Sequence, residues 1–341
     1  MGIYDLLTLT GGLSLFLYGM YLMGEGLSKA AGGKLERILG RLTDSPVRAV
    51  LCGAGVTAVI QSSSAATVMV VGFVNSGIMR LSQAVGVIMG ANIGTTITSW
   101  ILGLAGLDSS SVLVQLMKPT SFSPILALVG VSLLLSSKKD QHKNIASVLV
   151  GFSILMFGMD TMSSGVKPLV SVPGVSGILT GFSHPLAGLA AGLALTAVLQ
   201  SSSASVGILQ ALCATGTVSY GAAIPIVLGQ NIGTCVTAML SAVGTGKNAK
   251  RAALVHLYFN MVGAGVFLAG FCVVRTFFTP AFLTEAADGF GVALIHSAFN
   301  IGATMLLFPF SKWLVRLACL TVPGNDKDAS VIRPAPIHSR V

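Results

Sequence analysis

The chain contains two copies of one unit, because a shift of 139 residues places its first third on its middle third. Residues 57–65 (TAVIQSSSA) fall on residues 196–204 (TAVLQSSSA), and residues 90–95 (GANIGT) fall on residues 229–234 (GQNIGT). The same shift pairs Gly19 with Gly158. A duplicated apolar unit with a polar motif at its centre is typical of secondary transporters.

Apolar stretches make up most of the sequence, of which 53% is hydrophobic and only 9% is charged. This composition excludes an ordinary soluble globular protein and predicts a polytopic membrane protein. Because the stretches are continuous apolar runs rather than short alternating ones, we expect an all-α fold. No basic stretch precedes the first run, so we expect a retained span and no cleaved signal.

Two of the apolar stretches, residues 47–79 and 186–218, differ from the rest. Each would form one helix roughly 50 Å long, far beyond a hydrocarbon core of about 30 Å, and each has Gln-Ser-Ser-Ser at its middle. We therefore predict two re-entrant helical hairpins, whose polar tips lie near the bilayer midplane. The predicted membrane spans are residues 4–24, 82–105, 120–137, 145–166, 219–243, 252–277 and 289–317.

The odd number of membrane spans in each copy predicts how the two copies are oriented. If the hairpins do not cross the membrane, each copy has three spans, and the second copy must be inverted. The loop after the first span is rich in Lys and Arg, whereas its counterpart carries only Lys167, as inversion and the positive-inside rule require. With the N-terminus outside and the C-terminus cytoplasmic, only Lys118, Lys167 and Arg275 of the 20 Lys and Arg residues fall outside.

The domain organisation follows from these spans. We expect one transmembrane transporter domain over residues 1–318, in which repeat 1 covers about 4–137, repeat 2 covers about 145–277, and an extra span covers about 289–317. Residues 319–341 contain three prolines, mixed charge and little apolar content, which predicts a disordered cytoplasmic tail.

The duplicated motifs offer ligands for an anion and for a cation. Each hairpin tip supplies an amide, three hydroxyls and the N-terminus of a helix, and such an end favours an anion. The two Asn-Ile-Gly-Thr segments bring glycines into an apolar span, so the helix can open there and expose carbonyl oxygens suited to sodium. Residues 53–104 and 186–243 contain no Asp or Glu, and Arg80 is their only Lys or Arg. A bound dianion therefore needs cations beside it, which predicts coupled transport.

Three other polar residues are weaker candidates. Asp160 lies deep in the fourth span, where a carboxylate either serves function or pairs with a neighbouring hydroxyl. His256 and His296 each belong to a His-x-x-Phe-Asn pattern, which places His and Asn on one face of a helix. These histidines either bridge helices or support the site from a second layer of contacts. The sequence leaves the roles of all three open.

The paired Gln-Ser-Ser-Ser and Asn-Ile-Gly-Thr motifs closely resemble those of the type II sodium-dependent phosphate cotransporters and their bacterial relatives. The resemblance covers roughly residues 4–318 and implies a bacterial Na⁺/phosphate cotransporter of the cell inner membrane, in a short form without the PhoU-like domain. It implies sodium as the coupling ion and as the only metal, with no cofactor and no nucleic-acid partner. The oligomeric state stays unknown. Carried over by position, the phosphate ligands are Gln61, Ser62, Ser63, Ser64, Gln200, Ser201, Ser202 and Ser203. The implied sodium ligands are Gln61, Ser64, Asn92, Thr95, Gln200, Ser203, Asn231 and Thr234.

Three alternatives remain open from the sequence. A sodium-coupled carrier of carboxylates or amino acids would also use a serine-rich hairpin, although such carriers place an Asn-Met-Asp-Gly segment in their second half, and this chain lacks one. A phosphate sensor would bind without moving solute. An intramembrane serine hydrolase would need one Ser with His256 or His296 as base, but neither tip has a Gly-x-Ser-x-Gly elbow, and one catalytic site gives duplication no role.

Overall fold

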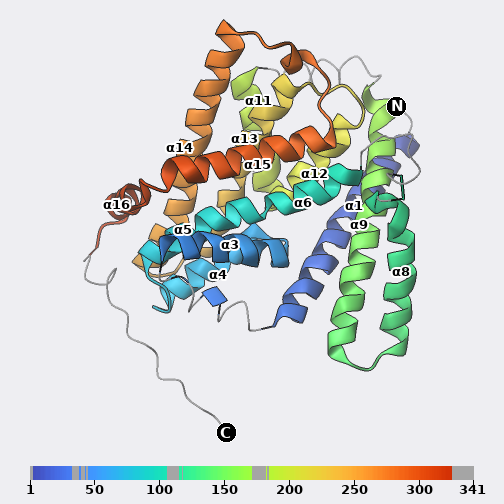
Figure 1. Ribbon diagram of the computed structural model, residues 1–341, viewed down its shortest axis with the longest axis horizontal. Helices are drawn as coiled ribbons and strands as arrows, with labels where there is room; N and C mark the ends of the chain where they lie inside the picture. The colour runs from blue at the N-terminus through green and yellow to red at the C-terminus, as the bar shows by residue number, and fades with distance from the viewer. Residues whose placement is uncertain are drawn as a thin grey trace.

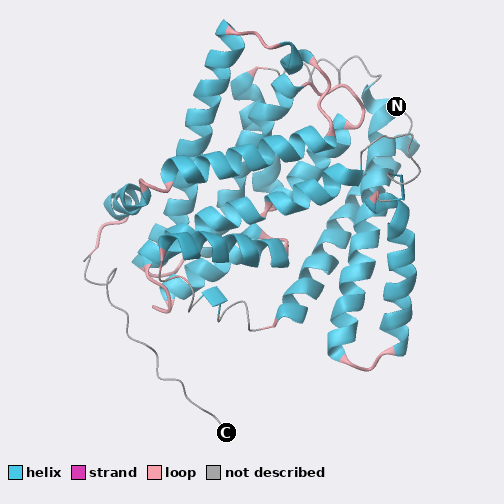
Figure 2. Cartoon of the chain, in the orientation of Figure 1, coloured by secondary structure: helices cyan, strands magenta, loops and turns pink. Residues whose placement is uncertain are grey.

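The computed structural model describes residues 3–32, 38, 39, 43, 45–105, 115, 116, 118–170, 182 and 184–324. These residues are almost entirely helical, as the composition predicts, and none of them forms an extended strand (Figure 2). The helices of the first part of the chain are α1 (Ile3–Ala31), α3 (Pro46–Ile60), α4 (Ser63–Asn75), α5 (Leu81–Gly94), α6 (Thr96–Ala105) and α8 (Pro119–Ser136). The later helices are α9 (Asp140–Val170), α11 (Pro185–Leu199), α12 (Ser202–Cys213), α13 (Tyr220–Ser241), α14 (Lys247–Phe277), η1 (Ala281–Thr284), α15 (Gly289–Leu307) and α16 (Ser311–Thr321).

Among the described residues, seven helical stretches are long and apolar enough to cross a membrane, counting α5 and α6 as one. The chain is therefore a multi-pass membrane protein. The central stretches are α5–α6 and α13, because 78% and 67% of their apolar windows are buried, against 17% for α8. Four further apolar helices, α3, α4, α11 and α12, have only 12 to 15 residues, or at most about 22 Å of helix. Each predicted hairpin is thus a pair of short helices, and its re-entrant insertion stays a prediction.

The equivalent helices α1 and α9 run antiparallel, side by side (Figure 1). Each carries three glycines at intervals of seven residues, and every one of the six meets the partner backbone at close range. The facing residues are Gly12 with Met162, Gly19 with Leu155, Gly26 with Val148, Gly151 with Met23, Gly158 with Phe16, and Gly165 with Leu9. Residue numbers rise along one helix as they fall along the other, and the 139-residue shift exchanges the pairs. Two inverted repeats related by a pseudo-twofold axis produce this register.

Glycines also set the packing of each hairpin on the long helix that follows it. A Cβ atom on Gly53 or Gly90 would collide with the backbone at the crossing of α3 and α5. Gly192 and Gly229 take the same positions at the crossing of α11 and α13. Such small residues let two membrane helices approach closely. The glycines of the Asn-Ile-Gly-Thr segments belong to this interface as well, since a Cβ on Gly94 would collide with α3.

Three sequence predictions need correction. The predicted opening of the helix at Asn-Ile-Gly-Thr is wrong for the second copy, where α13 is continuous through Asn231 and Thr234. In the first copy, only Thr95 interrupts α5–α6, and its backbone remains right-handed and helical. The predicted span 289–317 is two helices, because α15 ends at Leu307 and the separate α16 begins at Ser311. Helix α16 also continues into the predicted tail, to Thr321, while residues 325–341 lie outside the described part.

Candidate functional site

The two Gln-Ser-Ser-Ser segments form the same sharp turn between two short helices. Gln61 ends α3 and Gln200 ends α11, with positive φ angles of 60° and 55°. Only one other non-glycine residue in the described part, Thr279, has a positive φ. A left-handed backbone costs a residue with a Cβ atom roughly 1–2 kcal/mol. Glutamine in place of glycine at these two positions therefore indicates that the glutamine side chain itself is needed there.

The first serine of each motif begins the second helix of its hairpin. The Ser62 Oγ accepts a hydrogen bond from the Ala65 N–H at 3.1 Å, and the Ser201 Oγ accepts one from Ala204 at 3.2 Å. Ser62 and Ser201 are therefore N-caps that shape the turn. Within the helix, the next two N–H groups, on Ser63 and Ser64 or on their counterparts, have no carbonyl partner one turn earlier. Each tip thus presents unpaired backbone donors together with the partial positive charge of a helix end.

The two tips meet at the centre of the molecule. The Ser63 and Ser202 hydroxyl oxygens lie 3.4 Å apart, and both side chains are 3% exposed. These two residues are equivalents under the 139-residue shift, so the pseudo-twofold axis passes between them. The Ser64 hydroxyl also donates to the Gln200 carbonyl at 3.1 Å, which joins the tips a second time. Residues 139 positions apart in the sequence therefore form one buried polar junction.

This junction brings the N-termini of α4 and α12 together without a nearby countercharge from the motifs themselves. The convergence of two partial positive charges favours an anion between them. Of the predicted phosphate ligands, Ser63 and Ser64 of the first copy contact Ser202 and Gln200 of the second, and Gln200 is exposed whereas Ser202 and Ser203 are buried. The arrangement can bind an oxyanion through hydroxyl and backbone donors, and it has no nucleophile–base pair at the tips.

Two threonines that the sequence analysis did not single out hold the tip glutamines. The Thr98 hydroxyl donates to Gln61 Oε1 at 2.7 Å, and the Thr237 hydroxyl approaches the Gln200 carbonyl oxygen at 3.4 Å. The two threonines are themselves related by the 139-residue shift. Extending the repeat comparison three residues beyond Asn-Ile-Gly-Thr would have identified both.

The predicted sodium ligands divide into two groups. Thr95 belongs to the junction, because its hydroxyl lies 3.4 Å from those of both Ser202 and Ser203. Thr234 does not take the equivalent position, since its hydroxyl donates to the Gln230 carbonyl within α13 at 2.9 Å. The amides of Asn92 and Asn231 likewise donate to carbonyls one turn earlier in their own helices. The structure therefore gathers hydroxyl oxygens more closely around the first copy of this motif than around the second.

The weaker candidates take different places. His296 bridges helices as one of the two interpretations predicts, because its Nδ1 lies 2.7 Å from the Ser99 hydroxyl on α6. Neither ring nitrogen of the fully buried His256 has a partner among the described residues. Asp160 is exposed on the surface of α9 rather than turned into the core.

Comparison with known proteins gives a consistent set of similarities. The sequence model of a family described as Na⁺/Pi-cotransporter matches residues 15–164 and again residues 155–299, once for each repeat. The chain is 29% identical to the uncharacterized protein YqeW of Bacillus subtilis over 94% of its own length and 99% of that protein. It is 27% identical to the putative inorganic phosphate export protein YjbB of Escherichia coli K12, over 96% of its own length and 58% of that protein.

A shorter similarity reaches an animal protein. Over 95 residues the chain is 39% identical to the sodium-dependent phosphate transport protein 2A of Ovis aries, which covers 26% of this chain and 15% of the sheep protein. No solved structure matches the chain.

Proposed function

Because the chain belongs to the Na⁺/Pi-cotransporter family, we propose that it carries inorganic phosphate across the cell inner membrane, coupled to sodium. The family is a transporter family, and the chain is not an enzyme. The names of two relatives, a putative phosphate exporter and a sodium-dependent phosphate transport protein, support phosphate as the solute. We further propose that the N-terminus is outside and the C-terminus cytoplasmic.

The observation that carries the proposal is the meeting of the two tips, where Ser63 and Ser202 are 3.4 Å apart. In this proposal phosphate sits between the two Gln-Ser-Ser-Ser turns and is held by their hydroxyls, amides and helix N-termini. Because the repeats are antiparallel, the two hairpins approach the shared site from opposite directions. Movement of one hairpin and then the other would expose it to alternate sides of the membrane.

Sodium is proposed to supply the positive charge that the junction lacks. Two helix ends together offer about one positive charge, which is less than a phosphate dianion needs in a low-dielectric interior. Thr95, Ser202 and Ser203 already place three hydroxyl oxygens close together, and hydroxyl and carbonyl oxygens are ligands for hard cations. Anion and cation would then each strengthen the binding of the other, which is the thermodynamic origin of coupling.

Phosphate flux into proteoliposomes tests this function, with the sodium gradient imposed, removed and reversed. We expect labelled phosphate to follow the sodium gradient. Reversal of the gradient should reverse the flux, because coupled transport runs in whichever direction the gradient drives it. Equal flux in sodium and in potassium would contradict the coupling. Competition by aspartate or citrate stronger than that by arsenate would favour the carboxylate carrier, and binding without flux would favour the sensor.

The threonines that contact the tip glutamines provide an asymmetric prediction. Thr98→Val removes the 2.7 Å hydrogen bond to the Gln61 side chain, and Thr237→Val removes only a 3.4 Å contact to a backbone oxygen. We expect the KM for phosphate to rise roughly 3- to 10-fold in Thr98→Val, the effect of one lost hydrogen bond. Thr237→Val, the matched control, should change KM less than about threefold. Equal effects of the two variants on the concentration dependence of flux would contradict this assignment.

A further inference from the structure

Helix α16 lies across its neighbours rather than alongside them. It follows α15 after a short turn that contains Pro309, and its 11 residues form only about 16 Å of helix, too little to cross a hydrocarbon core of about 30 Å. In Figure 1, α16 is seen nearly end-on, whereas α14 and α15 both run along the page. Because α14 and α15 are long enough to cross the membrane, a helix that lies across both runs along the membrane surface.

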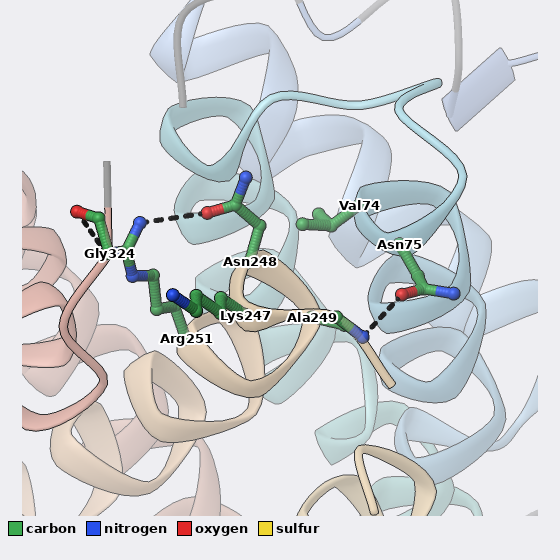
Figure 3. A pocket seen from close by; sticks show the side chains of 8 residues that line it. Val74, Asn75, Lys247, Asn248, Ala249, Arg251 and Gly324 are labelled. Carbon is green, nitrogen blue, oxygen red and sulfur yellow. Dashed lines mark hydrogen bonds between the residues drawn. The ribbon is translucent and has the colours of Figure 1, made fainter. Parts of the chain in front are cut away.

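Contacts at the end of α16 fix its position on α14. Arg251 Nε donates to the Val322 carbonyl at 3.0 Å, and Arg251 Nη2 donates to the Gly324 carbonyl at 3.4 Å (Figure 3). The hydroxyl oxygens of Tyr258 and Thr321 lie 2.7 Å apart. The apolar run of α14 begins directly after Arg251, so α16 is held where that run meets the polar start of the helix.

The two faces of α16 have different surroundings. Leu314 and Ala318 are buried in the core that also contains residues of α5 and α14. Four exposed residues occupy the opposite face, and they are Lys312, Trp313, Arg316 and Leu320. The two basic residues are four positions apart and share one edge of this face, whereas Trp313 and Leu320 are seven apart and share the other. None of the residues of α16 is acidic.

The apolar edge of the exposed face needs a covering. Trp313 is 47% exposed and Leu320 is 72% exposed, at the level where the membrane boundary is expected. Tryptophan is enriched at such boundaries, and helices that lie in the interface combine basic residues with Trp, Phe or Leu. An anionic lipid surface complements both edges, because its phosphates attract the two basic side chains while its acyl chains cover the apolar ones.

We propose that α16 is an interfacial helix whose exposed face binds the headgroups of anionic phospholipids. Lys312 and Arg316 contact the headgroup phosphates, and Trp313 and Leu320 enter the boundary between headgroups and acyl chains. Because α16 is joined to α14 through Arg251, the bound lipids also hold the start of α14 at the membrane surface.

The test uses Trp313 as a fluorescent depth probe. The chain has only two tryptophans, so Trp100→Phe leaves Trp313 as the single fluorophore. The protein is placed in phosphatidylcholine nanodiscs that contain a fixed fraction of brominated lipid, either phosphatidylcholine or phosphatidylglycerol. The bromine lies near the headgroup in one set and near the end of the acyl chain in another. The measurement needs neither inorganic phosphate nor sodium, so its outcome is independent of the proposed transport.

We expect bromine near the headgroup to quench Trp313 more strongly than bromine near the end of the acyl chain. Brominated phosphatidylglycerol should quench roughly tenfold more effectively than the same fraction of brominated phosphatidylcholine, as two basic residues at an anionic surface predict. Lys312→Gln/Arg316→Gln should remove this preference and keep the dependence on depth. Equal quenching by the two headgroups before that change would overturn the proposal. Quenching by aqueous acrylamide in place of lipid would also overturn it, and would favour a soluble partner.

Two controls separate α16 from the overall charge of the protein. Lys138→Gln/Lys139→Gln removes the same charge from the exposed turn between α8 and α9, and should leave the preference at Trp313 unchanged. In Trp313→Phe the remaining Trp100, half-buried and bonded to the Ser297 hydroxyl at 2.8 Å, should show no preference. The difference between the wild type and Trp313→Phe also isolates the Trp313 signal without altering Trp100. An equal preference at Trp100, or its loss in the Lys138/Lys139 variant, would contradict a site on α16.

Discussion

Replacing either tip glutamine should greatly reduce sodium-driven phosphate flux while the protein remains folded. In Gln61→Ala or Gln200→Ala the amide beside the proposed anion is lost, and a group that contacts a charged ligand contributes roughly 1.5–3 kcal/mol. The expected fall in flux is therefore roughly 10- to 100-fold, measured as initial rates of labelled phosphate uptake into proteoliposomes. In Gln61→Ala, the Thr98 hydroxyl also loses the side-chain oxygen to which it now donates a hydrogen bond.

Glycine at the same position separates chemistry from backbone strain. Gln61→Gly removes the same amide as Gln61→Ala, but glycine adopts the φ of 60° without a Cβ penalty. We expect both variants to lose flux equally. The free energy of unfolding of Gln61→Gly should be about 1 kcal/mol higher than that of Gln61→Ala. Unfolding in detergent measures the second quantity. If Gln61→Gly restored flux, the turn geometry rather than the amide would be the functional requirement.

A single methyl group at the crossing of α3 and α5 should cause a large loss of stability. In Gly53→Ala the new Cβ would collide with the carbonyl group of Val87, so the two helices must separate. Overpacking of this kind costs about 3 kcal/mol or more when the obstacle is backbone, because no side chain can rotate away. The loss should appear as a lower free energy of unfolding and as a lower yield of folded protein.

Gly55→Ala is the matched control, since this glycine lies on the same helix and a Cβ there meets no atom within 4 Å. Alanine is the better helix former, so this variant should match the wild type or exceed its stability by about 0.5–1 kcal/mol. A comparable loss in both variants would mean that glycine acts in α3 through backbone flexibility. A loss confined to Gly53→Ala would establish close approach as its role.

The sequence determined much of the fold because its strongest signals are local or repeated. Apolar length predicts spans, and the positions of the long helices agree with those predictions apart from the break between α15 and α16. Apolar length does not predict that break, because residues 289–317 are apolar over most of their length, whereas α16 has its own partly polar face. The exact repetition of Gln-Ser-Ser-Ser also identified both turns in advance, and parity predicted the inversion that the antiparallel α1 and α9 display.

The sequence by itself therefore determined which segments are helices, where the hairpins turn and how the two copies are related. Tertiary structure decided which polar groups meet: Ser63 with Ser202, Thr95 with Ser202 and Ser203, and Thr98 with Gln61. It also decided that Thr234 stays within its own helix, although its motif matches that of Thr95. Helix formation and membrane insertion depend on neighbours along the chain, whereas these contacts depend on how closely glycine-lined helices approach and on small departures from twofold symmetry.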